Sequence, residues 1–320
     1  MKQIKNYPIN NSPLYKLSNT AKLAKILEVD KKYLVHFVCT RDNYKCWERD
    51  KKNGNGKRPV EDPKYELKKI QSILNKLLSR VITNEYLMSG KKHSSYIVNA
   101  QYHKDNPYIF CFDLHSFFQT ATRKYIFKSF VNEFKMSDDI AWLITDLATI
   151  PKEDNSDGYI PTGSPSSQTV IYWAYKSTFD KILSIAKQKK LKFSLYVDDM
   201  TFSSANPIAN NFPKLITKLC AKVGLEINSK KTKYFSKKQY KNVTGCIITP
   251  KQELKVPNKR RKEILDIIKN KPVEKMNIKE IRSFYGKLNS MRQIEPYIFQ
   301  QLYNRAKKQY YKLEAQYSNR

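Results

Sequence analysis

The chain has 320 residues, of which 40% are apolar and 12% aromatic, a composition that excludes a disordered tail and allows a sizeable core. Sixty Lys and Arg residues stand against 29 Asp and Glu, giving a formal net charge of +31. Such a protein attracts polyanions, because each neutralised phosphate releases condensed counterions. We therefore expect nucleic acid as the partner and not a membrane surface, since no basic amphipathic segment dominates.

Cysteine spacing and hydropathy exclude further classes of protein. The cysteines form no CxxC pair and no ligand spacing with histidine, so neither a zinc site nor a disulfide framework is expected. No apolar run reaches spanning length and no signal-peptide pattern occurs, so the sequence predicts a cytoplasmic protein without a membrane partner. The five cysteines are Cys39, Cys46, Cys111, Cys220 and Cys246.

The N-terminal third predicts helices on either side of a basic hairpin or loop. Residues 18–50 have the apolar spacing of two short helices, with Asn19 among the candidate N-caps. This pair is interpreted either as packing helices or as the helix-turn-helix of a DNA-binding regulator. Residues 51–66 are polar and turn-rich, and residues 67–81 have the 3.6-residue period of an amphipathic helix.

Two apolar segments, 107–118 and 193–204, predict buried strands that carry acids. Asp113 ends the first run, and Asp198 and Asp199 stand where the second strand should turn back on itself. Buried carboxylates are costly unless they are paired or bind metal. Phosphoryl transfer uses two Mg²⁺ ions about 3.5–4 Å apart, held by such carboxylates. We expect Asp113 and Asp198 to bridge the two ions and Asp199 to assist.

A second acidic pair, Asp138–Asp139, receives a different interpretation. It follows Ser137 and precedes an apolar run, which predicts the acidic first turn of a helix, stabilised by the helix dipole. The pair is therefore not expected to be catalytic.

The C-terminal segment 251–320 has a helical pattern, with Asn277 and Glu280 at capping-box spacing. It holds 18 Lys and Arg and 7 Asp and Glu, a surplus of 11 positive charges. We expect a basic cluster in this segment to face phosphates, and its tyrosines either to stack on unpaired bases or to pack the helices together. The cluster is Lys259, Arg260, Arg261 and Lys262, and the tyrosines are Tyr285, Tyr297, Tyr303, Tyr310 and Tyr311.

Four ordered motifs give the chain a family resemblance over residues 50–250. They are the acid-aromatic segment Phe112–Phe118, the turn Pro161–Ser167, the YxDD sequence Tyr196–Asp199 and the segment Gly224–Thr232. In this order and spacing the chain resembles the reverse transcriptases. Two further matches, Asn99–His103 to an NAxxH signature and Val243–Gly245 to a VTG triplet, resemble the bacterial retron enzymes.

The resemblance implies an α+β right-hand polymerase fold with fingers, a palm of antiparallel sheet and helices, and a helical thumb. The expected domains are an N-terminal helical extension (1–50), fingers (51–106), a palm (107–250) with a fingers insertion near 120–165, and a basic thumb (251–320). The implied activity is RNA-directed DNA synthesis from dNTPs on a structured noncoding RNA. Retron enzymes prime on a guanosine 2′-hydroxyl of that RNA, make a branched RNA–DNA product, and serve with an effector protein against phage.

The resemblance also implies nucleotide-binding roles. Phe118 would be the steric gate against a ribose 2′-hydroxyl, with a core aromatic as the alternative. Arg58 would contact the triphosphate as a bidentate donor, with a solvated loop charge as the alternative. Lys231 would lie near the triphosphate, although Lys230 beside it is also a candidate.

At some positions the sequence departs from the family pattern, and at others the sequence leaves the residue's role open. Many relatives have an acid where Ser116 stands and a glutamine where Thr162 stands, so the turn at Thr162 and Gly163 lacks an amide contact to the nucleotide. The roles of Asn99 and His103 are either RNA contact or buried hydrogen bonding, and Thr244 with Gly245 predicts a tight turn near the primer backbone.

Three other functions remain open at this point. One is a prokaryotic reverse transcriptase without branched priming, another is the DNA-binding regulator, and the third is a degenerate polymerase that serves as an RNA scaffold. The sequence does not determine the oligomeric state, the RNA or the effector.

Overall fold

The computed structural model describes residues 6–50, 56–154 and 156–318. The chain divides into two compact units, and each is described by itself. The first unit takes its residues from 1–94, 112–200 and 209–232, and the second from 95–111, 201–208 and 233–320. None of the helices in the described ranges is both long and apolar enough to cross a bilayer.

The N-terminal part of the first unit contains two short helices, α1 (Thr20–Leu27) and α2 (Lys31–Val35). The Asn19 side chain caps α1, as expected for one of the candidates. Buried leucines on α1 and α2 and the contact between α1 and helix α3 (Tyr65–Leu78) show a packing pair. A recognition helix needs an exposed face of several turns, and α2 has 5 residues.

The second half of segment 18–50 differs from the helical prediction. Residues Tyr44–Asp50 form strand β1, which pairs antiparallel with β2 (Lys57–Pro63). The ladder hydrogen bonds to β2, the next strand along the chain, determine this conformation. The expected hairpin or loop at 51–66 is therefore a hairpin, although its residues 51–55 lie outside the described ranges.

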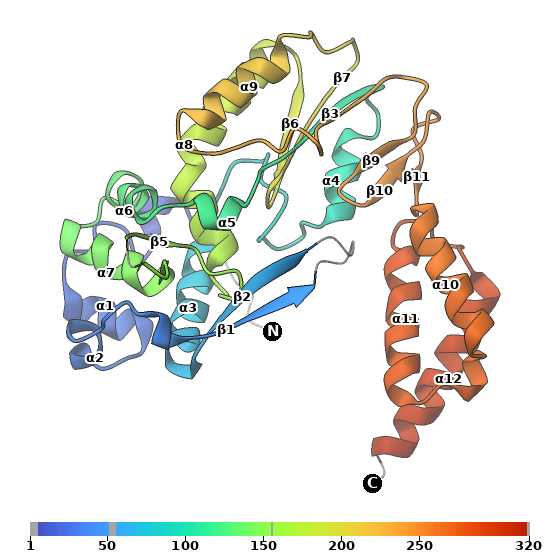
Figure 1. The fold of residues 1–320 in the computed structure, drawn as a ribbon, viewed down its shortest axis with the longest axis horizontal. Coiled ribbons are helices and arrows are strands. Elements are labelled where there is room, and N and C mark those ends of the chain that lie inside the picture. Colours follow the sequence, from blue (N-terminus) through green and yellow to red (C-terminus); the bar gives the residue numbers. More distant parts are fainter. Residues whose placement is uncertain (1–5, 51–55, 155, 319–320) are drawn as a thin grey trace. The chain divides into compact units, whose positions relative to one another are not determined.

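Helices surround the apolar core of the first unit (Figure 1). The predicted helix at 67–81 is α3 (Tyr65–Leu78), which buries Leu67, Ile70 and Leu74. The acids Asp138 and Asp139 occupy the first turn of α7, as predicted. The other helices and short strands are α5 (Phe117–Thr120), α6 (Arg123–Asn132), α7 (Asp138–Ala148), α8 (Ser167–Gln188), α9 (Phe212–Ala221), β4 (Ile150–Pro151) and β5 (Gly158–Tyr159).

The two predicted apolar strands belong to one four-stranded sheet with the order β6-β7-β3-β8. The 107–118 run forms β3 (Tyr108–Asp113), and the 193–204 run forms β6 (Lys192–Tyr196) and β7 (Asp199–Ser204), separated by Val197 and Asp198. Strand β8 (Lys233–Phe235) pairs antiparallel with β3. The chain passes between the two units within β3 and β7.

The second unit combines α4 (Tyr96–His103) and a small sheet with the C-terminal helices. The sheet has the order β11-β10-β9. The capping box at Asn277 and Glu280 is present, as predicted, and Ile264, Phe284 and Leu288 are buried in the core of this unit. The remaining elements are β9 (Lys241–Val243), β10 (Cys246–Ile248), β11 (Leu254–Lys255), α10 (Asn258–Asn270), α11 (Ile278–Arg292) and α12 (Gln300–Ser318).

Candidate active site

The three predicted catalytic acids lie at one place in the first unit. Asp113 is the last residue of β3, and Asp198 and Asp199 stand at the turn from β6 into β7. The Leu114 N–H donates to the Asp198 carbonyl at 2.9 Å, which joins the end of β3 to that turn. The local sequence explains where the strands end, because β3 ends at Asp113 and β6 ends at Tyr196, two residues before Asp198.

Burial and mutual repulsion make the carboxylates of Asp198 and Asp199 reluctant to ionise. Burial, and then the charges of Asp198 and Asp113, raise the pKa of Asp199 to about 7. Burial is also the main cause that raises the pKa of Asp198, with the Asp113 charge adding to it, while Lys231 and Arg58 oppose the shift. Such a group of acids favours the approach of a cation.

Lys231 reaches the site directly. Its Nζ donates to both carboxylate oxygens of Asp113, at 2.9 and 3.1 Å, and this contact is the main cause that raises the pKa of Lys231. Backbone bonds from Asn228 N to Asp113 O (2.8 Å) and from Lys231 N to Asn228 O (3.1 Å) place the lysine there. Of the two candidate lysines, Lys231 is thus the one that contacts a predicted catalytic acid.

The donor set fits a hard divalent cation in its chemistry. Within the described ranges, no three His, Cys, Asp or Glu side chains are arranged to hold a metal ion. Asp113 is instead neutralised by Lys231, whose ammonium lies against both its oxygens. Carboxylates are nonetheless the ligands that Mg²⁺ prefers, and a cation would relieve the repulsion that raises the pKa of Asp199.

Metal affinity is expected to depend on pH through Asp199. Below pH 7 this carboxyl is protonated, so a cation must displace the proton, and affinity should weaken by up to about tenfold per pH unit. The stability of the metal-free protein depends on pH in the opposite direction. Because the folded pKa exceeds the ordinary value of 3.8, the stability that Asp199 contributes is fully present below about pH 4 and is lost as pH rises from there to about 7. Mg²⁺ titration followed by thermal shift from pH 4 to 8 measures both effects. The same slope in Asp199→Asn would contradict the assignment.

The YxDD turn is held by a residue that the sequence analysis did not identify. Val197 has φ of 57°, a left-handed conformation that is unfavourable for a β-branched residue. Its N–H donates to Ser89 Oγ at 2.9 Å, and Ser89 is 8% exposed. Backbone bonds from Met88 N to Leu195 O (2.8 Å) run alongside, so the segment that contains Ser89 follows β6.

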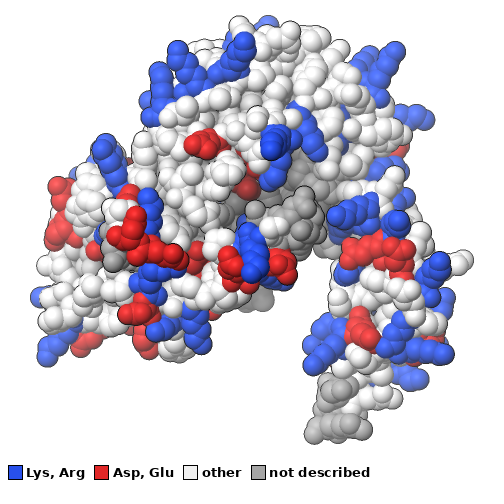
Figure 2. Space-filling model, viewed as in Figure 1, with Lys and Arg blue, Asp and Glu red and all other residues white. Residues whose placement is uncertain are grey.

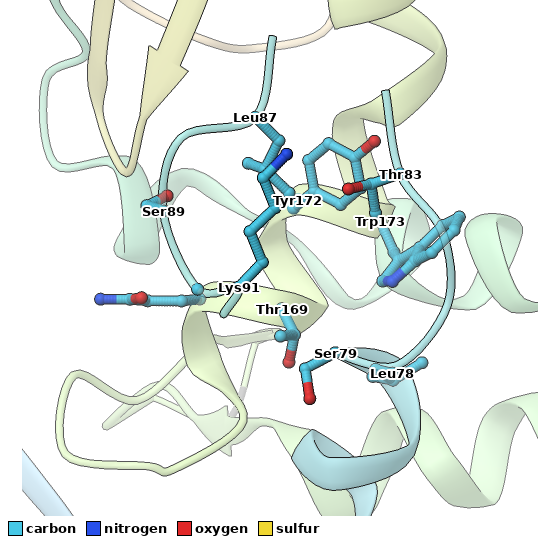
Figure 3. Close-up of a pocket in the computed structure, with 11 residues that line it drawn as sticks. Leu78, Ser79, Thr83, Leu87, Ser89, Lys91, Thr169, Tyr172 and Trp173 are labelled. Atoms are coloured by element: carbon cyan, nitrogen blue, oxygen red, sulfur yellow. The ribbon is translucent and has the colours of Figure 1, made fainter. Parts of the chain in front are cut away.

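Figure 3 shows Ser89 on a loop that passes beside Thr169, Tyr172 and Trp173 of α8. These groups line a cavity of about 20 Å³, which has room for about one water molecule. The loop is therefore packed against a rigid helix, and Ser89 is a fixed acceptor for the turn.

Ser89→Ala is expected to lower kcat for nucleotide incorporation about three- to tenfold, the equivalent of one hydrogen bond. The strained Val197 turn would then relax and move Asp198. Val197→Gly adopts the left-handed conformation without strain, so adding it should reduce the loss caused by Ser89→Ala. Steady-state kinetics of the two single variants and the double variant measure this coupling, and additive losses would contradict it.

Phe118 lies on α5, shortly after the strand that ends in Asp113, and Arg58 lies on β2. Phe117 is buried against Tyr175 and Phe179, whereas Phe118 is half-buried. The core aromatic is thus Phe117, which leaves Phe118 as the candidate gate. Arg58 is exposed on β2, and its charge acts on Asp198. Both roles stay predictions.

The predicted nucleotide turn at Thr162 and Gly163 is bound to β2 by hydrogen bonds. The Thr162 N–H donates to a carboxylate oxygen of Glu61 at 2.9 Å, and the Gly163 N–H donates to the Glu61 carbonyl at 3.2 Å. Glu61 is 1% exposed. No sequence pattern indicates this burial, because Glu61 stands beside Asp62 in a polar and basic hairpin.

The two signature motifs contact each other in the second unit. Asn99 Nδ2 donates to Thr244 Oγ1 at 3.3 Å, and Thr244 Oγ1 donates to the Tyr96 carbonyl at 2.9 Å. Thr244 and Gly245 have φ of 46° and 86°, which is the predicted tight turn. Asn99 is fully buried, and its Oδ1 has no hydrogen-bond partner among the described residues.

His103 is buried in the second unit, where its Nδ1 lies 2.7 Å from Ser203 Oγ. Asn106 Nδ2 donates to the same hydroxyl at 2.8 Å. This geometry fits the alternative of a buried, hydrogen-bonded histidine better than a direct RNA contact.

The predicted phosphate-facing cluster divides into two pairs. Lys259 and Lys262 are exposed, whereas Arg260 donates to Ser290 Oγ at 2.9 Å and Arg261 forms an ion pair with Glu295. An exposed ammonium contacts phosphate without losing an internal partner. The prediction of phosphate contact therefore rests chiefly on the lysines.

Tyr285 is a half-buried packing residue in the thumb-like helices. Its ring stacks on Tyr310 with centroids 5.3 Å apart, and its hydroxyl lies 3.2 Å from that of Tyr303. The alternative that these tyrosines pack the helices therefore describes Tyr285. Tyr297 is 83% exposed and free to stack on a base.

The sequence is similar to those of known proteins. A family model described as "Reverse transcriptase (RNA-dependent DNA polymerase)" matches residues 50–248. The Retron Ec83 reverse transcriptase of Escherichia coli is 26% identical over 211 residues, which cover 64% of this chain and 68% of that protein. The Retron Ec86 reverse transcriptase of Escherichia coli is 24% identical over 270 residues, which cover 82% of this chain and 80% of that protein. The Retron Se72 reverse transcriptase of Salmonella heidelberg is 24% identical over 229 residues, which cover 70% of this chain and 58% of that protein.

Two solved structures of foamy viral protease-reverse transcriptase are also similar. The complex with double-stranded DNA has a TM-score of 0.46 at 15% identity and covers 78% of this chain. The complex with an RNA/DNA hybrid has a TM-score of 0.45 at 16% identity and covers 90%. The chain spans 36% and 34% of the length of these viral proteins.

The family model covers more than half of the chain, and the mixture of helices and antiparallel sheet is the predicted α+β class of a right-hand polymerase. The predicted enzyme class, an RNA-directed DNA polymerase, is the one this family describes. The chain therefore belongs to the reverse transcriptase (RNA-dependent DNA polymerase) family, and its similarity to three retron enzymes confirms the expected bacterial retron type.

Proposed function

We propose that this chain copies a dedicated structured noncoding RNA into DNA, with Asp113, Asp198 and Asp199 holding two Mg²⁺ ions. The observation that carries the proposal is the meeting of these acids where β3 ends and β6 turns into β7, joined by the bond from Leu114 N to Asp198 O. When bound, the ions supply Lewis-acid activation of the attacking hydroxyl and neutralise charge on the leaving pyrophosphate.

The chain's own side chains bind and orient the incoming dNTP in this proposal. Lys231 lies against Asp113 and is placed to exchange that contact for the triphosphate, and Arg58 offers a planar, bidentate donor to the same group. Phe118 occupies the space that a ribose 2′-hydroxyl needs, so it selects deoxynucleotides. The backbone of Thr162 and Gly163 lines the far side of the nucleotide.

The second unit would hold the RNA template and its DNA product. Figure 2 shows Lys and Arg side chains over the helices α10 to α12, with a few acids between them. Lys259 and Lys262 are exposed there, and a surface of this kind recognises an A-form-like duplex through its phosphates. The turn at Thr244 and Gly245 presents backbone without a large side chain.

Three finer parts of the proposal rest on the similarity to retron enzymes. The chain primes on a 2′-hydroxyl of its RNA, it makes a branched RNA–DNA hybrid, and it acts with an effector protein in defence against phage. The effector and the defence role are tested together by plaque counts on cells that carry the whole locus, with and without Asp198→Asn.

The decisive experiment identifies the nucleic acid that copurifies with the protein. The chain is expressed with its native flanking locus, and the bound nucleic acid is run on a denaturing gel before and after RNase, beside the Asp198→Asn variant. A DNA band whose mobility increases after RNase, and which the variant lacks, supports branched synthesis. Unbranched DNA would place the chain with the other prokaryotic reverse transcriptases. RNA alone in both samples would mean an RNA scaffold and contradict the proposal.

A further inference from the structure

Glu61 on β2 is a buried carboxylate that the two-metal chemistry does not use. It is 1% exposed, and burial of such a group is costly unless donors surround it. One of its oxygens, Oε2, accepts from the Thr162 N–H at 2.9 Å and lies 2.9 Å from the Thr162 hydroxyl. The other, Oε1, accepts from the Tyr159 hydroxyl at 3.1 Å.

The backbone of the same residue is in close contact with the turn. The Gly163 N–H donates to the Glu61 carbonyl, and the Thr162 hydroxyl lies 2.8 Å from the Pro59 carbonyl. A Cβ at Gly163 would stand 2.5 Å from the Glu61 carbonyl oxygen. Strand β2 and the turn at 161–164 therefore fit together with no space for displacement.

Tyr159 extends these contacts to a third segment. It lies on β5 and shares a hydrogen bond with Arg41, which also donates to the Pro151 carbonyl at 3.0 Å. Burial raises the pKa of Tyr159, so its hydroxyl remains protonated and donates to Glu61. Glu61 is thus the common acceptor for the turn and for β5.

We propose that Glu61 is a positioning residue for the incoming nucleotide, because it fixes the turn at Thr162 and Gly163 against the strand that carries Arg58. This rests on the proposed function, in which Arg58 binds the triphosphate and the turn lines the nucleotide. Arg58 and the turn come from separate segments of the chain, and Glu61 lies three residues after Arg58 on β2. Its hydrogen bonds therefore determine their separation, and sub-ångström placement decides affinity at such sites.

The proposal also accounts for the contacts of the Thr162 side chain. The Thr162 N–H donates to Glu61, and the Thr162 hydroxyl lies within hydrogen-bond distance of both Glu61 and the Pro59 carbonyl, so this residue anchors the turn. A nucleotide contact from this turn then comes from backbone atoms. Glu61 and Thr162 thus act as a pair that holds the turn against β2.

The test compares Glu61→Leu, Glu61→Gln and the control Glu48→Gln in dNTP incorporation on an RNA template with a DNA primer. Glu48 is exposed on the neighbouring strand, opposite Pro59, and forms an ion pair with Lys57. Glu61→Leu is expected to raise the KM for dNTP about tenfold or more, with kcat within about threefold and the Kd for primer–template unchanged. Glu61→Gln should recover most of the affinity, because its carbonyl accepts from Thr162 N and its amide donates to the Tyr159 oxygen. The control should match the wild type.

An unchanged KM in a folded Glu61→Leu variant would overturn the proposal. Equal losses of kcat and primer–template binding, together with a lowered Tm and no recovery in Glu61→Gln, would show a purely structural role and would also overturn it. If Glu61→Leu does not fold, Tyr159→Phe removes a single partner of the carboxylate. That variant should raise the KM about two- to threefold, and an unchanged value would count against the inference.

Failure of the proposed function gives a different result. It would appear as wild-type protein that incorporates no dNTP, or as Asp198→Asn that incorporates as well as the wild type. Failure of the role of Glu61 leaves the wild type active and the Glu61 variants unchanged.

Discussion

Asp198→Asn is expected to abolish DNA synthesis, with a loss of about 10³-fold or more in kcat. The asparagine keeps the shape of the turn and its backbone bond to Leu114, but it removes an anionic ligand from the metal pair. Metal-assisted charge stabilisation supplies several kcal/mol, and about 4 kcal/mol corresponds to about 10³-fold. Single-nucleotide incorporation on an RNA template measures the effect.

Folding should not suffer in this variant, because the substitution removes a buried charge whose pKa is already raised by burial. Its Tm is expected to equal or exceed that of the wild type. The matched control is Asp139→Asn, which changes the other Asp-Asp pair in the first turn of α7 and should leave incorporation unchanged. Comparable activity losses in the two variants would show that neither pair is specific to catalysis.

Gly163→Ala is expected to lower kcat/KM for dNTP about 10²-fold. The added Cβ would stand 2.5 Å from the carbonyl oxygen and 2.8 Å from the carbonyl carbon of Glu61, which are distances that side chains do not adopt. The obstacle is the backbone of β2 and not a mobile side chain, so the turn itself must move. A displacement of about 1 Å at a reacting centre costs about 10²-fold.

Gly286→Ala is the control for Gly163→Ala. This glycine lies inside α11, and a Cβ there would meet nothing within 4 Å. Alanine should preserve incorporation and stabilise the helix by about 0.5–1 kcal/mol. Pre-steady-state incorporation with increasing dNTP separates binding from chemistry in both variants. Wild-type kinetics in Gly163→Ala would show that β2 and the turn are not in close contact in solution.

The Ser89 and Glu61 predictions concern different parts of the site, which makes them independent. Ser89 acts on the turn that carries Asp198, so its loss should appear in kcat. Glu61 acts on the turn at Thr162 and Gly163, so its loss should appear in the KM for dNTP. Residues without shared partners are expected to give additive effects when combined. The double variant Ser89→Ala with Glu61→Leu should therefore show the product of the two losses.

Local patterns in the sequence determined a large part of this picture. The apolar runs that end in Asp113 and at Asp198–Asp199, the helix that begins at Asp138, and the capping box of Asn277 were all predictable. Each depends on residues within one strand or one helical turn. Hydrophobic period, capping and the cost of a buried charge act at that range.

The tertiary structure alone decided which polar residues support the site. Glu61 meets Thr162 across 101 positions of the chain, and Ser89 meets Val197 across 108. The internal pairs of Arg260 and Arg261 and the packing of Tyr285 likewise depend on partners in other elements. A hydrogen bond has no local signature when its donor and acceptor come from separate elements, because only the packing of those elements brings them within 3 Å.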